Sequence, residues 1–112
     1  EGNEEFGEFF EQLVCMELKA WISYKSPRSR LTFWRTTSGN EVDFCLDDSL
    51  AIEVKSTDSV IDRHLKGLKT LREEGIFKRY IVVCREEYPR KVDGIEILPW
   101  KYFFESLWKE EK

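Results

Sequence analysis

Apolar and polar residues alternate along two neighbouring stretches, 41–46 and 50–55, and a period of two is typical of β-strands. The turn-forming residues Asp-Asp-Ser lie between the stretches and predict that the two strands pair as a hairpin. The first strand is expected to point Val42, Phe44 and Leu46 to one face and Glu41, Asp43 and Cys45 to the other. In the second strand the same rule separates Ile52 and Val54 from Ala51, Glu53 and Lys55.

Apolar spacings of three and four residues predict helices on both sides of these strands and at the end of the chain. The expected elements are a helix over 4–24, strands over 31–36, 41–46 and 50–55, a helix over 60–74, strands over 78–84 and 95–98, and a helix with Pro99 in its first turn. Asp58 or Ser59 is expected to cap the second helix, and residues 86–93 are expected to form a loop. The buried side of the second helix is expected to carry Ile61, Leu65, Leu68 and Leu71.

The strand expected over 78–84 contains Tyr80-Ile81-Val82-Val83-Cys84, a continuous apolar run. Such runs are typical of strands covered on both faces and paired in parallel after a helical crossover. The order of elements therefore predicts an α/β fold, with a mixed central sheet flanked by helices.

Length and composition limit the setting. The chain has 112 residues, which suits one domain, and its start at Glu1 rather than methionine predicts a fragment of a longer protein. With 36% charged residues and no long apolar segment, we expect a cytoplasmic domain without a membrane partner. The three cysteines, Cys15, Cys45 and Cys84, are far apart in apolar segments and are expected to be reduced core residues.

Asp43, Glu53 and Lys55 would share one face of the hairpin, where a folded protein usually places apolar side chains. Two carboxylates about 5 Å apart at an effective dielectric of about 20 repel by roughly 3 kcal/mol. A divalent cation would reverse this repulsion, and Mg²⁺ takes one or two carboxylates together with waters and phosphate oxygens. Lys55 could then hold a phosphate, or orient or deprotonate an attacking water. The alternative is a plain salt bridge of Lys55 on a solvated sheet face.

Two acids of the first helix are further candidates. At about 100° per residue, Glu11 falls on the edge of the apolar stripe and Glu17 near its centre. Glu11 could approach a site beside the sheet, or it could be an ordinary surface residue. Glu17 must find a partner or line a cavity, because burying an unpaired carboxylate is costly.

The second helix carries the densest basic patch of the chain, with Arg63, Lys66 and Lys69 as candidate phosphate contacts. The alternative is a solvated helix face, and His64 is expected to serve in packing. The formal net charge of −4 argues against binding of nucleic acid by bulk charge, so any phosphate contact has to be local.

The motifs around the candidate acids and Lys55 resemble those of known protein families. An acid on the first helix, Gly39-Asn40-Glu41-Val42-Asp43 and Ile52-Glu53-Val54-Lys55 resemble the E…D…ExK signature of the PD-(D/E)XK superfamily, the restriction-endonuclease-like nucleases. More closely, Phe10-Glu11-Gln12-Leu13-Val14, Glu17-Leu18, Phe33-Trp34-Arg35, Glu41-Val42-Asp43-Phe44 and Glu53-Val54-Lys55 resemble the C-terminal domain of a family of prokaryotic AAA+-type ATPases, a domain of unknown function numbered 4143. The resemblance covers nearly the whole chain.

The resemblance implies a restriction-endonuclease-like αβββαβ core with a closing C-terminal helix. It implies that Glu11, Asp43 and Glu53 hold Mg²⁺ or Mn²⁺, and that Asp43, Glu53 and Lys55 are catalytic. The implied activity is hydrolysis of phosphodiester bonds in DNA or RNA, by a domain attached to an ATPase domain of the same polypeptide. A homodimer is left open. The alternative is a catalytically inactive domain that docks a partner or regulates the ATPase.

Overall fold

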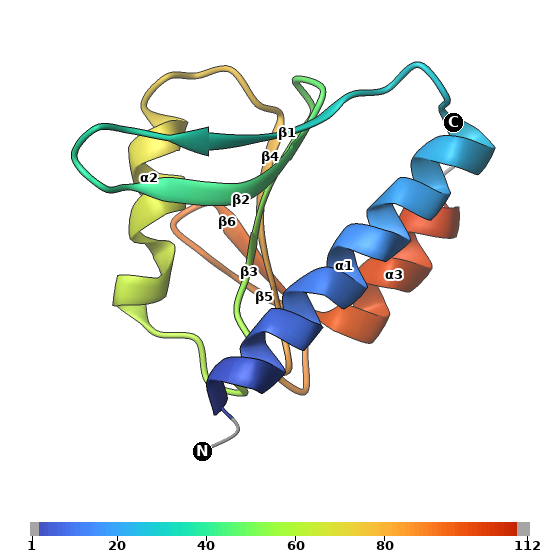
Figure 1. The fold of residues 1–112 in the computed structure, drawn as a ribbon. Helices are drawn as coiled ribbons and strands as arrows, with labels where there is room; N and C mark the ends of the chain where they lie inside the picture. Colours follow the sequence, from blue (N-terminus) through green and yellow to red (C-terminus); the bar gives the residue numbers. More distant parts are fainter. Residues whose placement is uncertain (1–2, 110–112) are drawn as a thin grey trace.

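The computed structural model describes residues 3–109, which form a six-stranded sheet with helices on both faces (Figure 1). The helices are α1 (Asn3–Lys25), the short 3-10 helix η1 (Asp62–Leu65), α2 (Lys66–Arg72) and α3 (Trp100–Lys109). The strands are β1 (Leu31–Arg35), β2 (Glu41–Leu46), β3 (Leu50–Val54), β4 (Arg79–Cys84), β5 (Arg90–Val92) and β6 (Ile95–Pro99). Within these residues, no helix combines the length and the apolar composition needed to cross a lipid bilayer.

The strand order is β1-β2-β3-β4-β6-β5. The first three strands form an antiparallel meander, β3, β4 and β6 run parallel, and β5 pairs antiparallel with β6. The chain passes from β3 to the parallel strand β4 through α2, which is the helical crossover that the apolar run of β4 predicted. The mixed α/β fold is therefore confirmed.

Two cores lie on opposite faces of the sheet. On one face α1 and α3 lie side by side (Figure 1) and pack with the strands through Phe10, Val14, Leu18, Ile52, Val54, Ile81, Val83, Leu98, Phe103 and Leu107. On the other face η1 and α2 pack through Val42, Cys45, Ala51, Val60, Leu65, Leu68, Leu71, Tyr80, Val82, Cys84, Ile95 and Ile97. Alternate residues of β4 enter alternate cores, which is why that strand is apolar along its length.

The alternation expected for the strand over 41–46 is wrong at one point. Val42 and Cys45 both enter the α2 core, whereas Phe44 packs toward α1 and α3. The pairing with β1 shifts here, because two steps along β1, from Thr32 to Trp34, match three steps along β2, from Cys45 to Val42. A β-bulge inserts one residue and turns the side chains after it to the other face. In β3 the expected alternation is confirmed, since Ala51 and Ile52 enter opposite cores.

The helix expected over 60–74 begins later than predicted, as η1 at Asp62. Neither Asp58 nor Ser59 caps it: the Ser59 N–H instead donates to the Thr57 hydroxyl at 3.0 Å and forms a separate turn. Ile61 was expected on the buried side and is 44% exposed, because it precedes the first helical residue.

The loop expected over 86–93 contains a strand, β5. This strand has three residues and two of them are basic, so it carries no apolar alternation that could identify it. The turn into β6 consists of Asp93 and Gly94, with positive φ angles of 52° and 79°, as tight hairpins require. At the end of β6, Pro99 is the last strand residue, so α3 begins at Trp100.

Gly67 lets α2 approach the backbone of β2. A Cβ atom added at Gly67 would lie 2.3 Å from the carbonyl oxygen of Glu41, so either the helix or the strand would have to move. This contact holds α2 against the strand that carries Asp43.

We expect Gly67→Ala to destabilise the protein by about 1–3 kcal/mol, because the forced shift outweighs the roughly 1 kcal/mol that alanine contributes to a helix. Urea unfolding measures the change. Gly7→Ala in α1 is the matched control, since its Cβ would meet only the Ser56 hydroxyl oxygen at 3.7 Å. The control should be neutral or stabilising, and equal stability of the two variants would contradict the close packing at Gly67.

Candidate functional site

The backbone ladder between β2 and β3 gives way to carboxylate contacts near Asp43. The two strands pair in register from Leu46–Leu50 to Phe44–Ile52. Beyond that point the Val54 N–H donates to Asp43 Oδ2 at 2.8 Å, and the Asp43 N–H donates to Glu53 Oε1 at 3.2 Å. The bulge in β2 and these two hydrogen bonds therefore bring Asp43 and Glu53 together at the point where the strands part.

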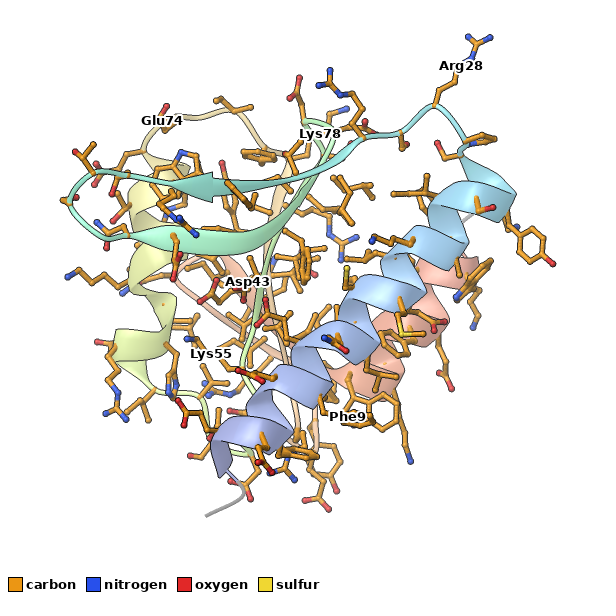
Figure 2. All side chains as sticks on the ribbon, in the orientation of Figure 1. Phe9, Arg28, Asp43, Lys55, Glu74 and Lys78 are labelled. Atoms are coloured by element: carbon orange, nitrogen blue, oxygen red, sulfur yellow. The ribbon has the colours of Figure 1, made fainter. Side chains whose placement is uncertain are left out.

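Lys55 completes this cluster. Its Nζ lies 3.3 Å from Glu53 Oε2, and its side chain is 37% exposed, whereas the side chain of Glu53 is 10% exposed. In the view of Figure 2, Asp43 and Lys55 lie between the ribbons of α1 and α2. The sequence predicted the convergence of Asp43, Glu53 and Lys55, and the observed contacts link all three.

Burial dominates the electrostatics of the two acids. It raises the pKa of Glu53 to about 8, the negative charge of Asp43 adds to this rise, and Lys55 opposes it. Burial also raises the pKa of Asp43, whereas the Val54 N–H and the Lys55 ammonium act to lower it. Two carboxylates this close to each other do not both ionise readily at neutral pH, so a cation at this point would displace a proton.

The structure separates the two acids of α1. Glu11 is exposed, and its pKa is raised by partial burial and then by the negative charges of Asp43 and Glu41. Glu17 instead accepts a hydrogen bond from Trp108 Nε1 at 2.7 Å, on the side of α3. Glu11 is therefore the helix acid that faces the cluster. Across residues 3–109, no set of three or more His, Cys, Asp or Glu side chains is arranged to hold a metal ion, so Glu11 stays apart from the Asp43–Glu53 pair.

The three basic residues predicted as phosphate contacts differ in their surroundings. Lys69 Nζ lies 3.3 Å from Asp93 and 3.7 Å from Asp62, so two carboxylates compete with any phosphate for it. Arg63 and Lys66 are exposed on the same helical segment.

His64 lies closer to the cluster than its expected packing role implied. Its Nδ1 accepts the Ile61 N–H at 2.9 Å, which leaves the proton of the neutral ring on Nε2. Burial and the positive charge of Lys55 lower the pKa of His64. No spacing in the sequence indicated this position, because it depends on where η1 begins.

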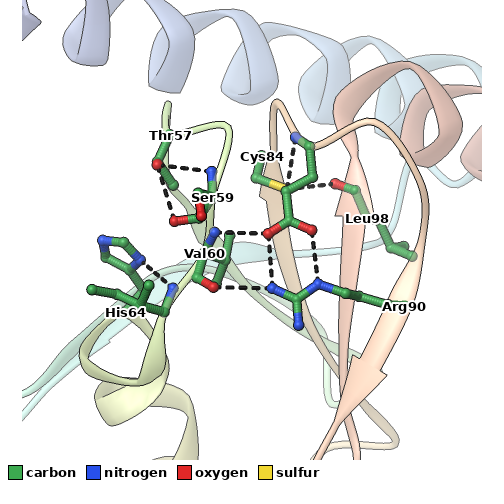
Figure 3. A network of polar contacts seen from close by, with 9 residues as sticks. Thr57, Ser59, Val60, His64, Cys84, Arg90 and Leu98 are labelled. Atoms are coloured by element: carbon green, nitrogen blue, oxygen red, sulfur yellow. Dashed lines mark hydrogen bonds and ion pairs between the residues drawn. The ribbon is translucent and has the colours of Figure 1, made fainter.

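The segment that follows Lys55 is held by an ion pair that the sequence did not single out (Figure 3). Glu86 accepts the Val60 N–H at 2.7 Å and the Arg90 Nε–H at 2.8 Å, and Arg90 also donates to the Val60 carbonyl at 3.0 Å. The hydrogen bond from Arg90 is the main reason that the pKa of Glu86 is lowered. These contacts, together with a hydrogen bond from Arg85 to the Ser56 carbonyl, fix the start of the crossover that carries Lys55.

The fold and the site define a mixed α/β domain with two carboxylates and a lysine beside parting strands. A family model described as Domain of unknown function (DUF4143) matches residues 6–103. This match spans most of the chain, and the protein belongs to that family. Comparisons with curated proteins and with solved structures returned no match.

The raised pKa of Glu53 predicts a pH-dependent stability. The folded chain holds the Glu53 proton more tightly than the unfolded chain, so stability is highest below pH 4.5 as far as this group is concerned and falls as the pH rises toward 8. Glu53→Gln removes this titrating group. Between pH 5 and pH 9 the free energy of unfolding of the variant should therefore fall by about 2–4 kcal/mol less than that of wild type. Urea unfolding in EDTA measures the difference.

Glu86→Gln is a comparison variant for which the effect of pH on stability should run in the opposite direction. The pKa of Glu86 is lowered, so its ion pair stabilises the fold above the ordinary pKa of a glutamate and is lost in acid. The variant should therefore be less stable than wild type at pH 7 and approach it at low pH. Parallel pH profiles for wild type and Glu53→Gln would contradict the burial of an ionisable Glu53.

Proposed function

We propose that this domain hydrolyses phosphodiester bonds of DNA or RNA with Mg²⁺ or Mn²⁺ held by Asp43 and Glu53. The observation that supports the proposal is the meeting of these two carboxylates at the parting of β2 and β3, with Lys55 Nζ 3.3 Å from Glu53. Burial of Glu53 and the negative charge of Asp43 both disfavour the ionised form of Glu53, and a divalent cation would offset both effects by attracting the two carboxylates.

The donor set fits Mg²⁺. Each carboxylate accepts a backbone N–H with one oxygen, Asp43 from Val54 and Glu53 from Asp43, and these bonds orient both side chains. Mg²⁺ needs only one or two protein carboxylates when waters and phosphate oxygens complete its shell. The resemblance implies Glu11 as a third acid; because Glu11 stays apart from the Asp43–Glu53 pair, it would have to approach the ion from the side of α1 or act through a bound water. When bound, the ion supplies Lewis-acid chemistry that offsets negative charge on the phosphate.

At the proposed site, Lys55 is the protein side chain that carries a positive charge next to the two acids. Its side chain is 37% exposed, so its ammonium group can contact solvent and a phosphate while it stays close to Glu53. In the proposed reaction a water adds to phosphorus and one ester oxygen leaves as an alcohol, and Lys55 stabilises the negative charge that builds on the phosphate oxygens.

Attachment to an AAA+-type ATPase stays a prediction that rests on the resemblance of the motifs. The competing function is a domain that docks a partner or regulates the ATPase without catalysis. The net charge of −4 and the engagement of Lys69 by two acids favour this competitor, because both reduce attraction for a phosphate backbone.

Cleavage assays separate the two functions. With Mg²⁺ or Mn²⁺, wild type should cut labelled DNA or RNA, and Asp43→Asn and Lys55→Ala should each lower the rate about 10²–10³-fold. Asp48→Asn and Lys78→Ala are matched controls at exposed positions and should retain the wild-type rate. Cleavage that persists in Asp43→Asn would indicate a contaminating nuclease.

The melting temperature with and without Mg²⁺ tests metal binding separately from cleavage. At 10 mM Mg²⁺ and a dissociation constant of about 1 mM, the ion would stabilise the fold by about 1.4 kcal/mol. This should raise the melting temperature by several degrees in wild type and leave that of Asp43→Asn unchanged, since the variant loses one of the two carboxylates proposed to hold the ion. No cleavage together with no metal-dependent shift would refute the nuclease and favour the docking domain.

A further inference from the structure

An apolar pocket of about 470 Å³ adjoins the acid pair. Leu31, Thr32, Phe33, Asp43 and Phe44 line it, so Asp43 belongs both to the pocket and to the candidate site. Phe44 pairs with Ile52 in the regular part of β2 and points to the face where Leu31 also packs, so it forms one wall of the pocket. The pocket therefore presents apolar surface directly beside a carboxylate that is proposed to hold a cation.

Phe33 supplies an exposed aromatic ring at this pocket. The residue lies on the edge strand β1 and is 65% exposed. The guanidinium carbon of Arg35 lies 5.2 Å from the centre of the Phe33 ring, and Arg35 Nε lies 3.3 Å from Glu41 Oε1. The Arg35 guanidinium, which is itself paired with Glu41, lies over the Phe33 ring and restrains this side chain before any ligand binds.

We propose that this pocket takes one unpaired base of a nucleic-acid strand, stacked on Phe33, while the adjoining phosphate reaches the Asp43–Glu53 site. The proposal rests on the proposed function and adds to it the class of substrate, namely single strands or frayed ends. Both faces of a base inside a duplex are already stacked on neighbouring bases. An exposed aromatic ring can therefore bind only a base that has left the stack.

The charge of the domain points to the same class of substrate. The chain carries a net charge of −4, and Glu11 and Glu41 lie near the acid pair, so phosphates gain little from the general field of the protein. Stacking on an aromatic ring supplies affinity that salt does not screen. We therefore expect weak salt dependence, in contrast to proteins that bind the backbone through many basic residues.

Fluorescence anisotropy with labelled oligonucleotides tests the proposal. The probes are a 15-nucleotide oligothymidylate and a hairpin duplex of equal phosphate number, in Ca²⁺, with the length of each probe checked on a gel. Wild type should bind the single strand at least about 10-fold more tightly than the duplex. Phe33→Ala should weaken single-strand binding about 5- to 100-fold, and Phe33→Trp should retain it.

Tyr88→Ala is the matched control, because Tyr88 is 72% exposed and lies in the loop between β4 and β5. It should bind both probes as wild type does. Equal affinity for single strand and duplex, absence of single-strand binding, or an unchanged Phe33→Ala would each overturn the base site. A second copy of the chain paired along the edge of β1 is the competing occupant, and a fall in oligomer size for Phe33→Ala by sedimentation would identify it.

The outcomes for the two proposals are distinguishable. Binding that depends on Phe33 without any cleavage would refute the nuclease and leave the base site standing. Cleavage of single strands that is equally fast in Phe33→Ala would refute the base site and leave the nuclease standing.

Discussion

The site depends on two hydrogen bonds within the sheet in which a side-chain carboxylate, rather than a backbone carbonyl, accepts a backbone N–H. Val54 donates its N–H to Asp43 Oδ2 at 2.8 Å, and Asp43 donates its own N–H to Glu53 Oε1 at 3.2 Å. A buried backbone donor needs an acceptor, so the strands can part only because these side chains supply one. The same two bonds orient both carboxylates, which joins the local architecture of the sheet to the proposed binding of a cation.

The elements around this point restrain it on the face of the sheet that α2 covers. On this face α2 approaches the Glu41 carbonyl so closely that only glycine fits at position 67. On the way to α2, Glu86 and Arg90 hold Val60 and so hold the crossover that starts at Lys55 (Figure 3). Pre-organisation of this kind suits charge stabilisation, because charged groups that are already in place need no reorganisation during a reaction.

Sequence reasoning succeeded where a regular period carries the information. Alternation in β3 placed Glu53 and Lys55 on the face of Ala51, and the apolar run of β4 predicted a buried parallel strand. It failed where a single local event decides the geometry. The bulge in β2 leaves no mark in the period of the strand, yet it places Val42 on the same face as Cys45. The partners of Lys69 likewise depend on a turn and a three-residue strand that apolar alternation could not reveal.

Glu53 is the one charged residue among residues 3–109 that is buried, and a fold selected for stability alone has no reason to keep it. An apolar residue at this position would extend the α2 core along β3 and avoid the burial that raises the pKa of Glu53 to about 8. Lys55 does not remove this cost, since the raised pKa already includes its attraction. A ligand of positive charge does remove it, because it attracts both carboxylates and favours their ionised forms. The cost of burying Glu53 beside Asp43 is therefore the physical reason for proposing a cation at this point.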